Sequence, residues 1–172
     1  MGTVRLNEVI TKMNLENLTP QIDVSKIKIR QPDINRPAVQ MTGYFEHFAA
    51  GRIQIIGLVE YSYMQQMSVE EKDRIYKKFL SLDIPCVVFC RELEPDELFM
   101  KYALENGVAL LMTRNATSNF MGEIMEADVE RLAQVPEITQ AAAEEIYRYF
   151  HDQPSDADEQ YTQHSPADAG EE

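Results

Sequence analysis

Three apolar runs without alternation constrain the fold of this chain more than any other feature of its sequence. They are RIQIIGLVEY (52–61), IPCVVFC (84–90) and VALLM (108–112). A strand that is apolar on both faces is typical of a parallel sheet buried between helices. Helical patterns separate the three runs, and parallel strands joined in this way have right-handed crossovers. The sequence therefore predicts an α/β fold, a three-layer sandwich with a largely parallel sheet.

Two helices are predicted between these strands. Ser68 and Glu71 have the spacing of a capping box, and an apolar stripe follows them at helical intervals. The stripe comprises Ile75, Phe79 and Leu82. Pro95 suits the first turn of the second helix, which Asn106 and Gly107 would end. Each connection is therefore expected to be helical, as a crossover between parallel strands usually is.

The N-terminal region predicts one more helix and one more strand. Thr3 can cap a helix whose apolar positions recur at helical spacing. Those positions are Leu6, Val9, Ile10 and Met13. The segment KIKIR (26–30) alternates between charged and apolar residues, which is typical of a half-exposed strand. Residues 31–51 are interrupted by proline and glycine and predict an irregular segment.

The composition divides the chain into three parts. We expect a domain over residues 1–125, a helical appendage over 126–153 and a tail over 154–172. The appendage is predicted to form two helices joined by a tight turn, a short helical hairpin. The tail carries six acidic side chains, two prolines and no basic residue. That composition predicts a disordered segment.

Negative charge is concentrated toward the C-terminus, in residues 127–172. The net charge is −13; residues 1–126 hold 17 acidic and 14 basic side chains, whereas residues 127–172 hold 12 and 2. The acidic part would repel nucleic acid and anionic membranes. No apolar run approaches the length that spans a bilayer, and the N-terminus lacks a signal-peptide pattern. We therefore expect a cytoplasmic protein without a membrane partner, and the charge argues against nucleic acid.

The sequence lacks the common motifs for catalysis and cofactor binding. None of the seven glycines is followed by lysine, so there is no P-loop, and no G-x-G-x-x-G occurs. The three histidines are scattered, and no spacing suggests a metal site. Cys86 and Cys90 lie four positions apart in a predicted strand, roughly 13 Å, which is too far for a disulfide. We expect no catalytic residue, no cofactor, no metal and two buried core thiols.

One candidate site depends on position instead of a motif. Ligands of open parallel sheets bind beyond the carboxyl ends of the strands. The residues in those positions that could hold a small anion are Arg91, Thr113, Arg114, Thr117 and Ser118. Two arginines beside a hydroxyl-rich helix start could form an anion cradle. The alternative is that the two arginines pair with Glu60, Glu92 or Glu94 at the surface.

Four blocks of the sequence resemble the N-terminal domain of bacterial HPr kinase/phosphorylase. They are DINRPAVQMTGYF (33–45), RIQIIGLVEYSYM (52–64), IPCVVFCRELEP (84–95) and ALENGVALLMTRNATSNFM (103–121). The family enzyme uses ATP to phosphorylate a serine of HPr, a protein of the phosphotransferase system, and reverses that reaction in carbon catabolite regulation. Its P-loop and metal-binding residues belong to a C-terminal domain. The resemblance therefore assigns no catalytic residue to this chain.

The resemblance implies a non-catalytic regulatory or interaction module. Such a module would self-associate, associate with an HPr kinase catalytic domain, or bind a small anion. The N-terminal domain of the family looks like the nucleotide-sugar-binding domain of certain cell-wall ligases. A truncated enzyme that works only with a separately encoded kinase domain is an alternative.

Residues 126–151 are similar to the last helix-hairpin-helix of the C subunit of the UvrABC excinuclease. The residues that would contact DNA in this motif are Arg131, Val135, Ile138, Thr139 and Arg148. Glu137 stands where the motif has glycine, and its carboxylate would repel a DNA phosphate. A DNA-associated adaptor is therefore the second hypothesis, and the acidic composition of this region opposes it.

Overall fold

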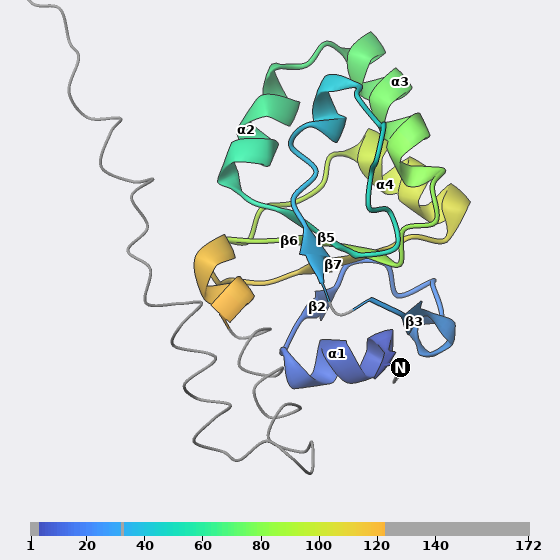
Figure 1. Cartoon of the computed structure of the whole chain (residues 1–172), viewed down its shortest axis with the longest axis vertical. Helices are drawn as coiled ribbons and strands as arrows, with labels where there is room; N and C mark the ends of the chain where they lie inside the picture. Colours follow the sequence, from blue (N-terminus) through green and yellow to red (C-terminus); the bar gives the residue numbers. More distant parts are fainter. Residues whose placement is uncertain (1–3, 32, 123–172) are drawn as a thin grey trace, which may run out of the picture. The chain divides into compact units, whose positions relative to one another are not determined.

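The computed structural model describes residues 4–31 and 33–122, which form an α/β unit around one mixed sheet (Figure 1). The sheet has five strands in the order β2-β7-β6-β5-β4. These are β2 (Glu16–Asn17), β4 (Ile34–Asn35), β5 (Ile53–Ile56), β6 (Cys86–Phe89) and β7 (Ala109–Met112). The strands β4 to β7 are parallel, and β2 pairs antiparallel with β7. The parallel arrangement of β5, β6 and β7 was predicted, whereas β4 lies in the segment 31–51 that was predicted to be irregular. The helical hairpin and the tail predicted beyond residue 125 lie outside the described residues.

Helices cover both faces of this sheet (Figure 1). Helices α2 (Leu58–Gln66), α3 (Val69–Leu80) and α4 (Glu97–Asn106) lie on one face, and α1 (Leu6–Lys12) lies on the other. The short 3-10 helix η2 (Gln40–Thr42) packs with α2 and α3. This arrangement confirms the α/β prediction, with apolar strands between two helical layers.

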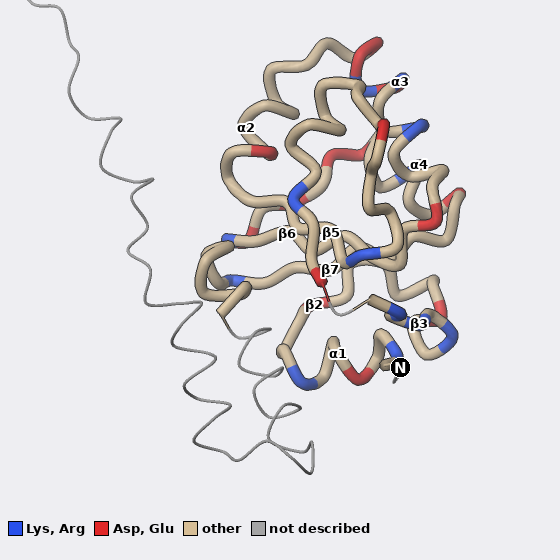
Figure 2. Tube along the Cα trace, viewed as in Figure 1, with Lys and Arg blue, Asp and Glu red and all other residues tan. Residues whose placement is uncertain are grey.

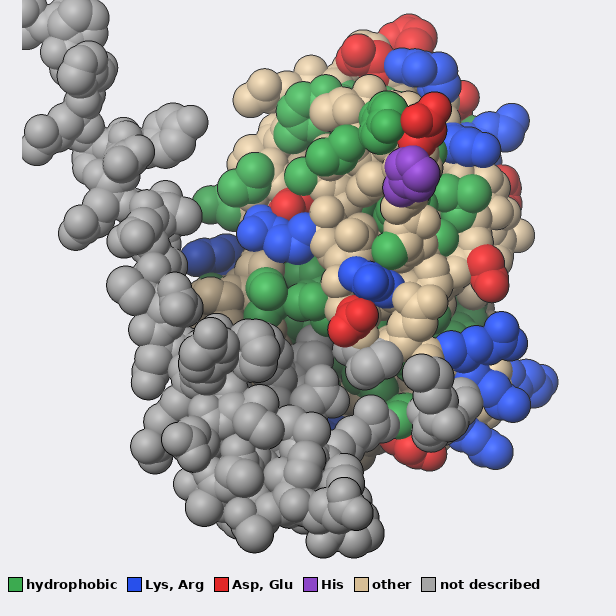
Figure 3. All heavy atoms as spheres, in the orientation of Figure 1, with side chains coloured by type: hydrophobic (Ala, Val, Ile, Leu, Met, Phe, Trp, Pro, Cys, Tyr) green, Lys and Arg blue, Asp and Glu red, His purple; other side chains and the backbone are tan. Residues whose placement is uncertain are grey.

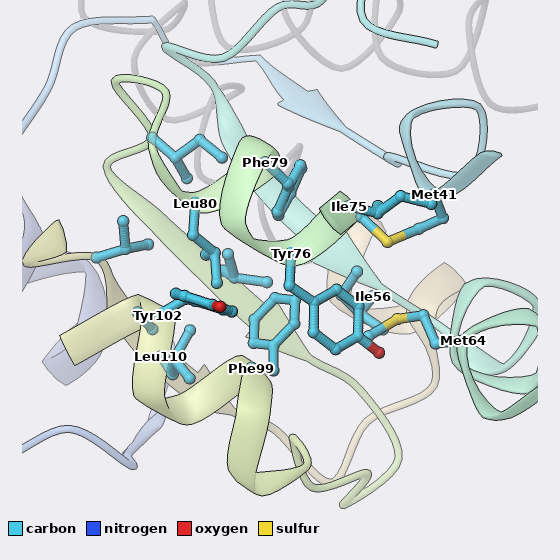
Figure 4. Close-up of a cluster of buried hydrophobic side chains, with 14 of the residues drawn as sticks. Met41, Ile56, Met64, Ile75, Tyr76, Phe79, Leu80, Phe99, Tyr102 and Leu110 are labelled. Carbon is cyan, nitrogen blue, oxygen red and sulfur yellow. The ribbon is translucent and has the colours of Figure 1, made fainter. Parts of the chain in front are cut away.

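An aromatic cluster joins α3 and α4 to the sheet (Figure 4). The ring of Phe99 lies 4.9 Å from that of Tyr76 and 5.4 Å from that of Phe89, measured between centroids. Both pairs are edge-to-face, which is a favourable geometry for aromatic rings. Burial, followed by the charge of Asp96, raises the pKa of Tyr76 well above its usual value. The cluster is therefore part of the packed core.

The opposite face of the sheet buries both cysteines. Cys86, Val88 and Cys90 point to this side, where they pack with Leu6 of α1 and with Phe120. Phe120 belongs to a helical segment that begins at residue 117. The two thiols are free, and burial raises the pKa of Cys86 to about 12. The prediction of two unpaired core thiols on one face is confirmed.

Helix ends follow their sequence signals closely. The Ser68 hydroxyl accepts a hydrogen bond from the Glu71 amide (3.2 Å), and the Glu71 carboxylate accepts one from the Ser68 amide (2.9 Å), so the predicted capping box is confirmed. Gly107 ends α4 with a φ of 68°, in the left-handed region. The N-cap of α4 is Asp96, whose carboxylate accepts from the Phe99 amide. Pro95 therefore precedes α4, and the prediction that it lies in the first turn of this helix is wrong.

The predicted strand 52–61 is wrong over its second half. Strand β5 ends at Ile56, and Gly57 becomes the N-cap of α2. Leu58 and Val59 are exposed, so the apolar run continues past the end of the buried strand. The apolar run gives no sign of the boundary between β5 and α2, because Leu58 and Val59 of α2 are exposed whereas Glu60 is buried. A prediction from the hydrophobic pattern would bury the apolar residues and expose the glutamate.

The N-terminal predictions need smaller corrections. Residue Thr3 lies outside the described residues, and the N-cap of α1 is Arg5, which provides no side-chain cap. Only Lys28–Ile29 of the predicted strand 26–30 forms a strand, β3, which pairs antiparallel with β1 (Val4–Arg5). The 3-10 helix η1 (Val24–Lys26) precedes it. Leu82 packs against the core but lies beyond the end of α3.

Candidate functional site

The carboxyl ends of the four parallel strands meet at one edge of the sheet, which we call the carboxyl edge. Arg36 follows β4, Gly57 follows β5, Cys90 follows β6 and Thr113 follows β7. Thr117 opens the next helical segment. In open α/β sheets this edge is the usual place for a ligand. Its geometry therefore decides what the chain can bind there.

A buried carboxylate occupies the start of α2 at this edge. Glu60 is 2% exposed, and its Oε1 accepts from Arg36 Nε at 3.0 Å. Its Oε2 accepts from Arg36 Nη2 at 3.1 Å and from the Gly57 amide at 2.9 Å. The first amides of a helix favour a negative group, and here the chain supplies that group itself. Sequence reasoning missed Arg36 because 24 residues separate it from its partner.

The space around Gly57 is closed. A Cβ at this position would collide with the Thr117 hydroxyl oxygen and approach Glu60 Oε2 to 3.2 Å and Arg36 Nη2 to 3.3 Å. Thr117 also hydrogen-bonds the Cys90 thiol. Burial raises the pKa of Cys90, and the bond from Thr117 and the charge of Arg36 oppose part of that shift. Thr117 therefore closes the edge between β5 and β6.

The turn after β6 has an unusual backbone. Arg91 and Glu92 have φ values of 57° and 56°, in a left-handed region that residues with a Cβ rarely occupy. The Leu93 amide donates to the Cys90 carbonyl at 3.1 Å and closes a tight turn. The Arg91 amide donates to Asn115 and the Glu92 amide to Thr113, each to the carbonyl at 3.0 Å. The loop after β7 therefore holds this strained turn in place.

The structure brings the predicted anion-binding residues to one edge but gives them different environments. Arg114 Nε pairs with Glu92 Oε1 at 2.9 Å, and both side chains are exposed. The alternative of surface pairing therefore describes Arg114. The Thr113 hydroxyl is buried and accepts from the Asn115 amide at 3.2 Å. Arg91 is exposed and has no ion pair with another residue in the described part of the chain.

Of the remaining predicted site residues, some lie within the described part of the chain, which ends at residue 122, and the others lie outside it. Ser118 is exposed, whereas Thr117 packs on Gly57. Thr113 and Arg114 also line a hollow of about 750 Å³ together with Lys12 and Glu16. The five predicted DNA-contacting residues between 131 and 148 lie outside the described residues, so DNA binding stays a prediction.

Neither a metal-binding cluster nor a membrane-spanning helix occurs within the described residues. Between residues 4 and 122, Pro32 excepted, no group of three or more His, Cys, Asp or Glu side chains could hold a metal ion. No helix in the same part of the chain is long and apolar enough to cross a membrane.

Comparison with known proteins identifies relatives of this chain. The family model described as "HPr Serine kinase N terminus" matches residues 4–127. An HPr kinase/phosphorylase from Lachnoclostridium phytofermentans is 50% identical over 125 residues, which cover 73% of this chain and 40% of that protein. One from Clostridium botulinum strain Eklund 17B is 35% identical over 130 residues, covering 76% and 42%. The chain thus spans about two fifths of the length of these curated relatives.

A solved structure shows a looser similarity. The CBS and DRTGG domains of the regulatory region of Clostridium perfringens pyrophosphatase are 14% identical to this chain, with a TM-score of 0.47. The match covers 69% of this chain and 45% of that chain. Similarity at this level supports no statement about the site.

Proposed function

We propose a regulatory and interaction role, without catalysis, for this chain, which belongs to the HPr serine kinase N-terminal family. The curated relatives carry the name HPr kinase/phosphorylase. The matched residues correspond to about two fifths of those proteins. The role we assign is to influence or assemble a kinase in carbon catabolite regulation, the process that the resemblance implies.

The observation that carries this proposal is the position of the Glu60 carboxylate. A glycine between a strand and a helix is where many α/β proteins bind a phosphate group, because free amides point at the ligand. Here the Gly57 amide already donates to Glu60, and Arg36 neutralises that carboxylate. A phosphate entering this position would meet a buried negative charge. This arrangement supports a role for these residues in completing the fold instead of transferring phosphate.

Incubation with HPr and labelled ATP tests the absence of catalysis. We expect no phosphoserine above background from the 172-residue chain, because neither its sequence nor its carboxyl edge provides a phosphate-binding loop. The full-length relative from Lachnoclostridium phytofermentans is the positive control. Phosphorylation of HPr by the purified chain at a rate near that of the control would refute the proposal.

An exposed apolar face on α2 supports the interaction role. Leu58, Val59 and Tyr63 are 53%, 67% and 43% exposed, and Val39 beside η2 is 55% exposed. Glu60 is the one charged residue of α2, and it is buried. An apolar, uncharged helix surface typically marks a protein contact. We propose that it mediates self-association, since two copies of an uncharged face meet without electrostatic repulsion.

A matched pair of substitutions tests this surface. Val59→Glu and Val69→Glu each place a carboxylate in the first turn of a helix at a highly exposed valine, 67% and 72% respectively. We expect Val59→Glu to abolish concentration-dependent sedimentation and Val69→Glu to preserve it. A kinase domain of the relative is added in a second arm. A chain that stays monomeric and binds no kinase domain would contradict the interaction role.

The small-anion site remains part of the proposal. Arg91 supports it, because it is exposed at the carboxyl edge and has no ion pair with another described residue. Calorimetric titration with phosphate, citrate and a nucleotide-sugar tests it. We expect Arg91→Ala to remove the heat of binding and Lys77→Ala, an exposed position on α3, to preserve it. Flat heats with all three ligands would remove the anion from the proposal.

A further inference from the structure

A cleft lies at the opposite edge of the sheet, where the parallel strands begin. Its volume is about 450 Å³. One wall is formed by residues that precede the strands, Gly51 before β5, Pro85 before β6 and Val108 before β7. The other wall is the segment from Lys26, at the end of η1, to Gln31, and it includes β3. We call this region the amino-edge cleft, and it shares no residue with the carboxyl edge.

Three cations follow one another along the second wall. Lys26, Lys28 and Arg30 line the cleft and are exposed, whereas Ile29 between them is buried. Lys26 is the last residue of η1, whereas Lys28 begins β3. In extended backbone, side chains two positions apart, as Lys28 and Arg30 are, point the same way and lie roughly 7 Å from each other. Basic residues gather around β3 in Figure 2, and Figure 3 shows basic side chains at the surface there. The cleft therefore presents a row of three positive charges on this wall, and Asp83 is the one carboxylate among the residues that line it.

A fourth cation faces this row. Arg5 is the direct cross-strand partner of Lys28 in the β1–β3 pair, and both are exposed. Side chains of directly opposite residues share one face, and like charges in such a pair destabilise a sheet. Lys26 has a carboxylate partner, Asp23, at 3.1 Å. No ion pair with a described residue offsets Arg5 or Lys28, so the two like charges stand opposite each other without compensation in the described part of the chain.

The backbone of β3 has one open edge. Val4 pairs with Ile29 and Arg5 with Lys28, and the Leu6 amide donates to the Ile27 carbonyl at 2.9 Å. In an antiparallel pair, hydrogen-bonded positions alternate with positions whose amide and carbonyl point away. Ile27 is bonded, so Lys28 is the position that points away from β1. Its backbone groups are available to another strand.

We propose that the amino-edge cleft binds an extended acidic peptide that pairs with β3. The backbone of the peptide would bond to the open edge at Lys28, and its alternate acidic side chains would meet the cations. A compact phosphate fits less well, because the C-terminal ends of α3 (Leu80) and α4 (Asn106) both lie close to the cleft, which Leu82 and Gly107 line. The carbonyl ends of helices disfavour concentrated negative charge. Carboxylates spaced along a strand distribute the charge instead.

Fluorescence anisotropy with a short labelled peptide in which glutamate alternates with valine tests the proposal on the full chain. We expect saturable binding that weakens as salt is raised, since exposed charges are screened. A peptide with glutamine in place of glutamate tests the charges. A glutamate peptide methylated on alternate backbone nitrogens tests the strand pairing, because it keeps every charge and loses the hydrogen bonds. Both should bind at least about tenfold more weakly.

Two charge reversals test the location. Lys28→Glu should weaken the alternating peptide by about tenfold or more, because it reverses the charge at the centre of the row. Lys77→Glu on α3 changes the net charge equally at an exposed position and should leave the affinity within about twofold. Peptide binding should also slow amide hydrogen exchange at Lys28.

Four results would overturn the proposal. Equal losses in the two variants would mean that the peptide senses only total charge. Equal binding of the methylated peptide would exclude strand pairing. Tripolyphosphate that binds as tightly as the peptide would make the cleft a site for compact anions. No binding at all would leave the cations with the single role of keeping the β3 edge unpaired.

Discussion

The two edges of the sheet use their charges in opposite ways. At the carboxyl edge, Glu60 is buried and its hydrogen bonds come from Arg36 and the Gly57 amide. At the amino-edge cleft, Arg5 and Lys28 face each other, and neither forms an ion pair with another described residue. Charges that satisfy one another complete the fold, whereas charges that repel one another are available to a partner. The edge that usually binds ligands is thus closed around Gly57 in this chain.

Removal of Glu60 should produce the largest loss of stability. Glu60→Leu leaves Arg36 and the Gly57 amide without their acceptor. Loss of one member of a buried pair costs several kcal/mol, and Arg36 is 43% exposed and can regain water, so we expect about 3 kcal/mol. Glu71→Leu removes the same capping position from α3, where it is exposed, and should cost about 1 kcal/mol. Because the chain has no tryptophan, urea unfolding is best followed by circular dichroism. Equal losses would mean that the carboxyl edge is no more tightly built than an ordinary helix start.

Gly57→Ala should have the next largest effect. The new methyl group would collide with the Thr117 hydroxyl, and overpacking of this kind costs about 2 kcal/mol. Gly107 provides the control, because a Cβ there meets no atom within 4 Å and only its left-handed backbone resists. Gly107→Ala should cost about 1 kcal/mol. Thr117→Ala combined with Gly57→Ala should recover part of the loss, and strict additivity would show that the two positions do not interact.

Arg5→Gln should stabilise the amino edge slightly. It removes the like charge opposite Lys28, so we expect a gain of about 0.5 kcal/mol in the free energy of unfolding. The gain should shrink in high salt, which screens the repulsion in the parent chain. Arg74→Gln on α3 is the control for loss of an exposed arginine. A loss of stability on Arg5→Gln would contradict the repulsion.

The smallest effect concerns Asp23, which sits beside the cationic row. The Ser25 hydroxyl, and after it Lys26, lowers the pKa of this carboxyl below 3.8. Because the folded pKa is lowered, the contribution to stability is present above pH 3.8 and lost as the pH falls through the folded value. Asp23→Asn should therefore be slightly less stable than the parent at neutral pH and equally stable at low pH. A difference that persists unchanged in acid would show that charge is not its cause.

The buried strands were predictable, and the helix beside them was not. Runs of apolar residues identify β6 and β7 because a strand that is covered on both faces needs apolar residues at every position. The same rule extended β5 too far, since α2 exposes Leu58 and Val59 and buries Glu60. Tertiary contacts override the hydrophobic pattern there. The two-residue strands β2 and β4 give no periodic signal at all.

The candidate site was predictable in place but not in chemistry. The rule for parallel sheets placed Arg91 and Arg114 at the carboxyl edge, where the structure has them. It did not reveal that Arg114 pairs with Glu92, nor that Arg36 pairs with Glu60 across 24 residues. Pairs so distant in sequence depend on the three-dimensional fold. The left-handed turn at Arg91 and Glu92 also lacks a signal, because neither residue type favours that conformation.

Strand β2 determines when this unit can be completed during synthesis on the ribosome. Glu16 and Asn17 pair with Met112 and Leu111, so one of the first strands to be made waits for the last strand of the sheet. At typical translation rates, roughly 5 to 20 residues per second, the wait lasts about 5 to 20 seconds. Throughout that interval the edges of β2 and β6 that will pair with β7 have no partner strand. We expect β2 to depend on chaperones, or on slow elongation, more than its length of two residues suggests.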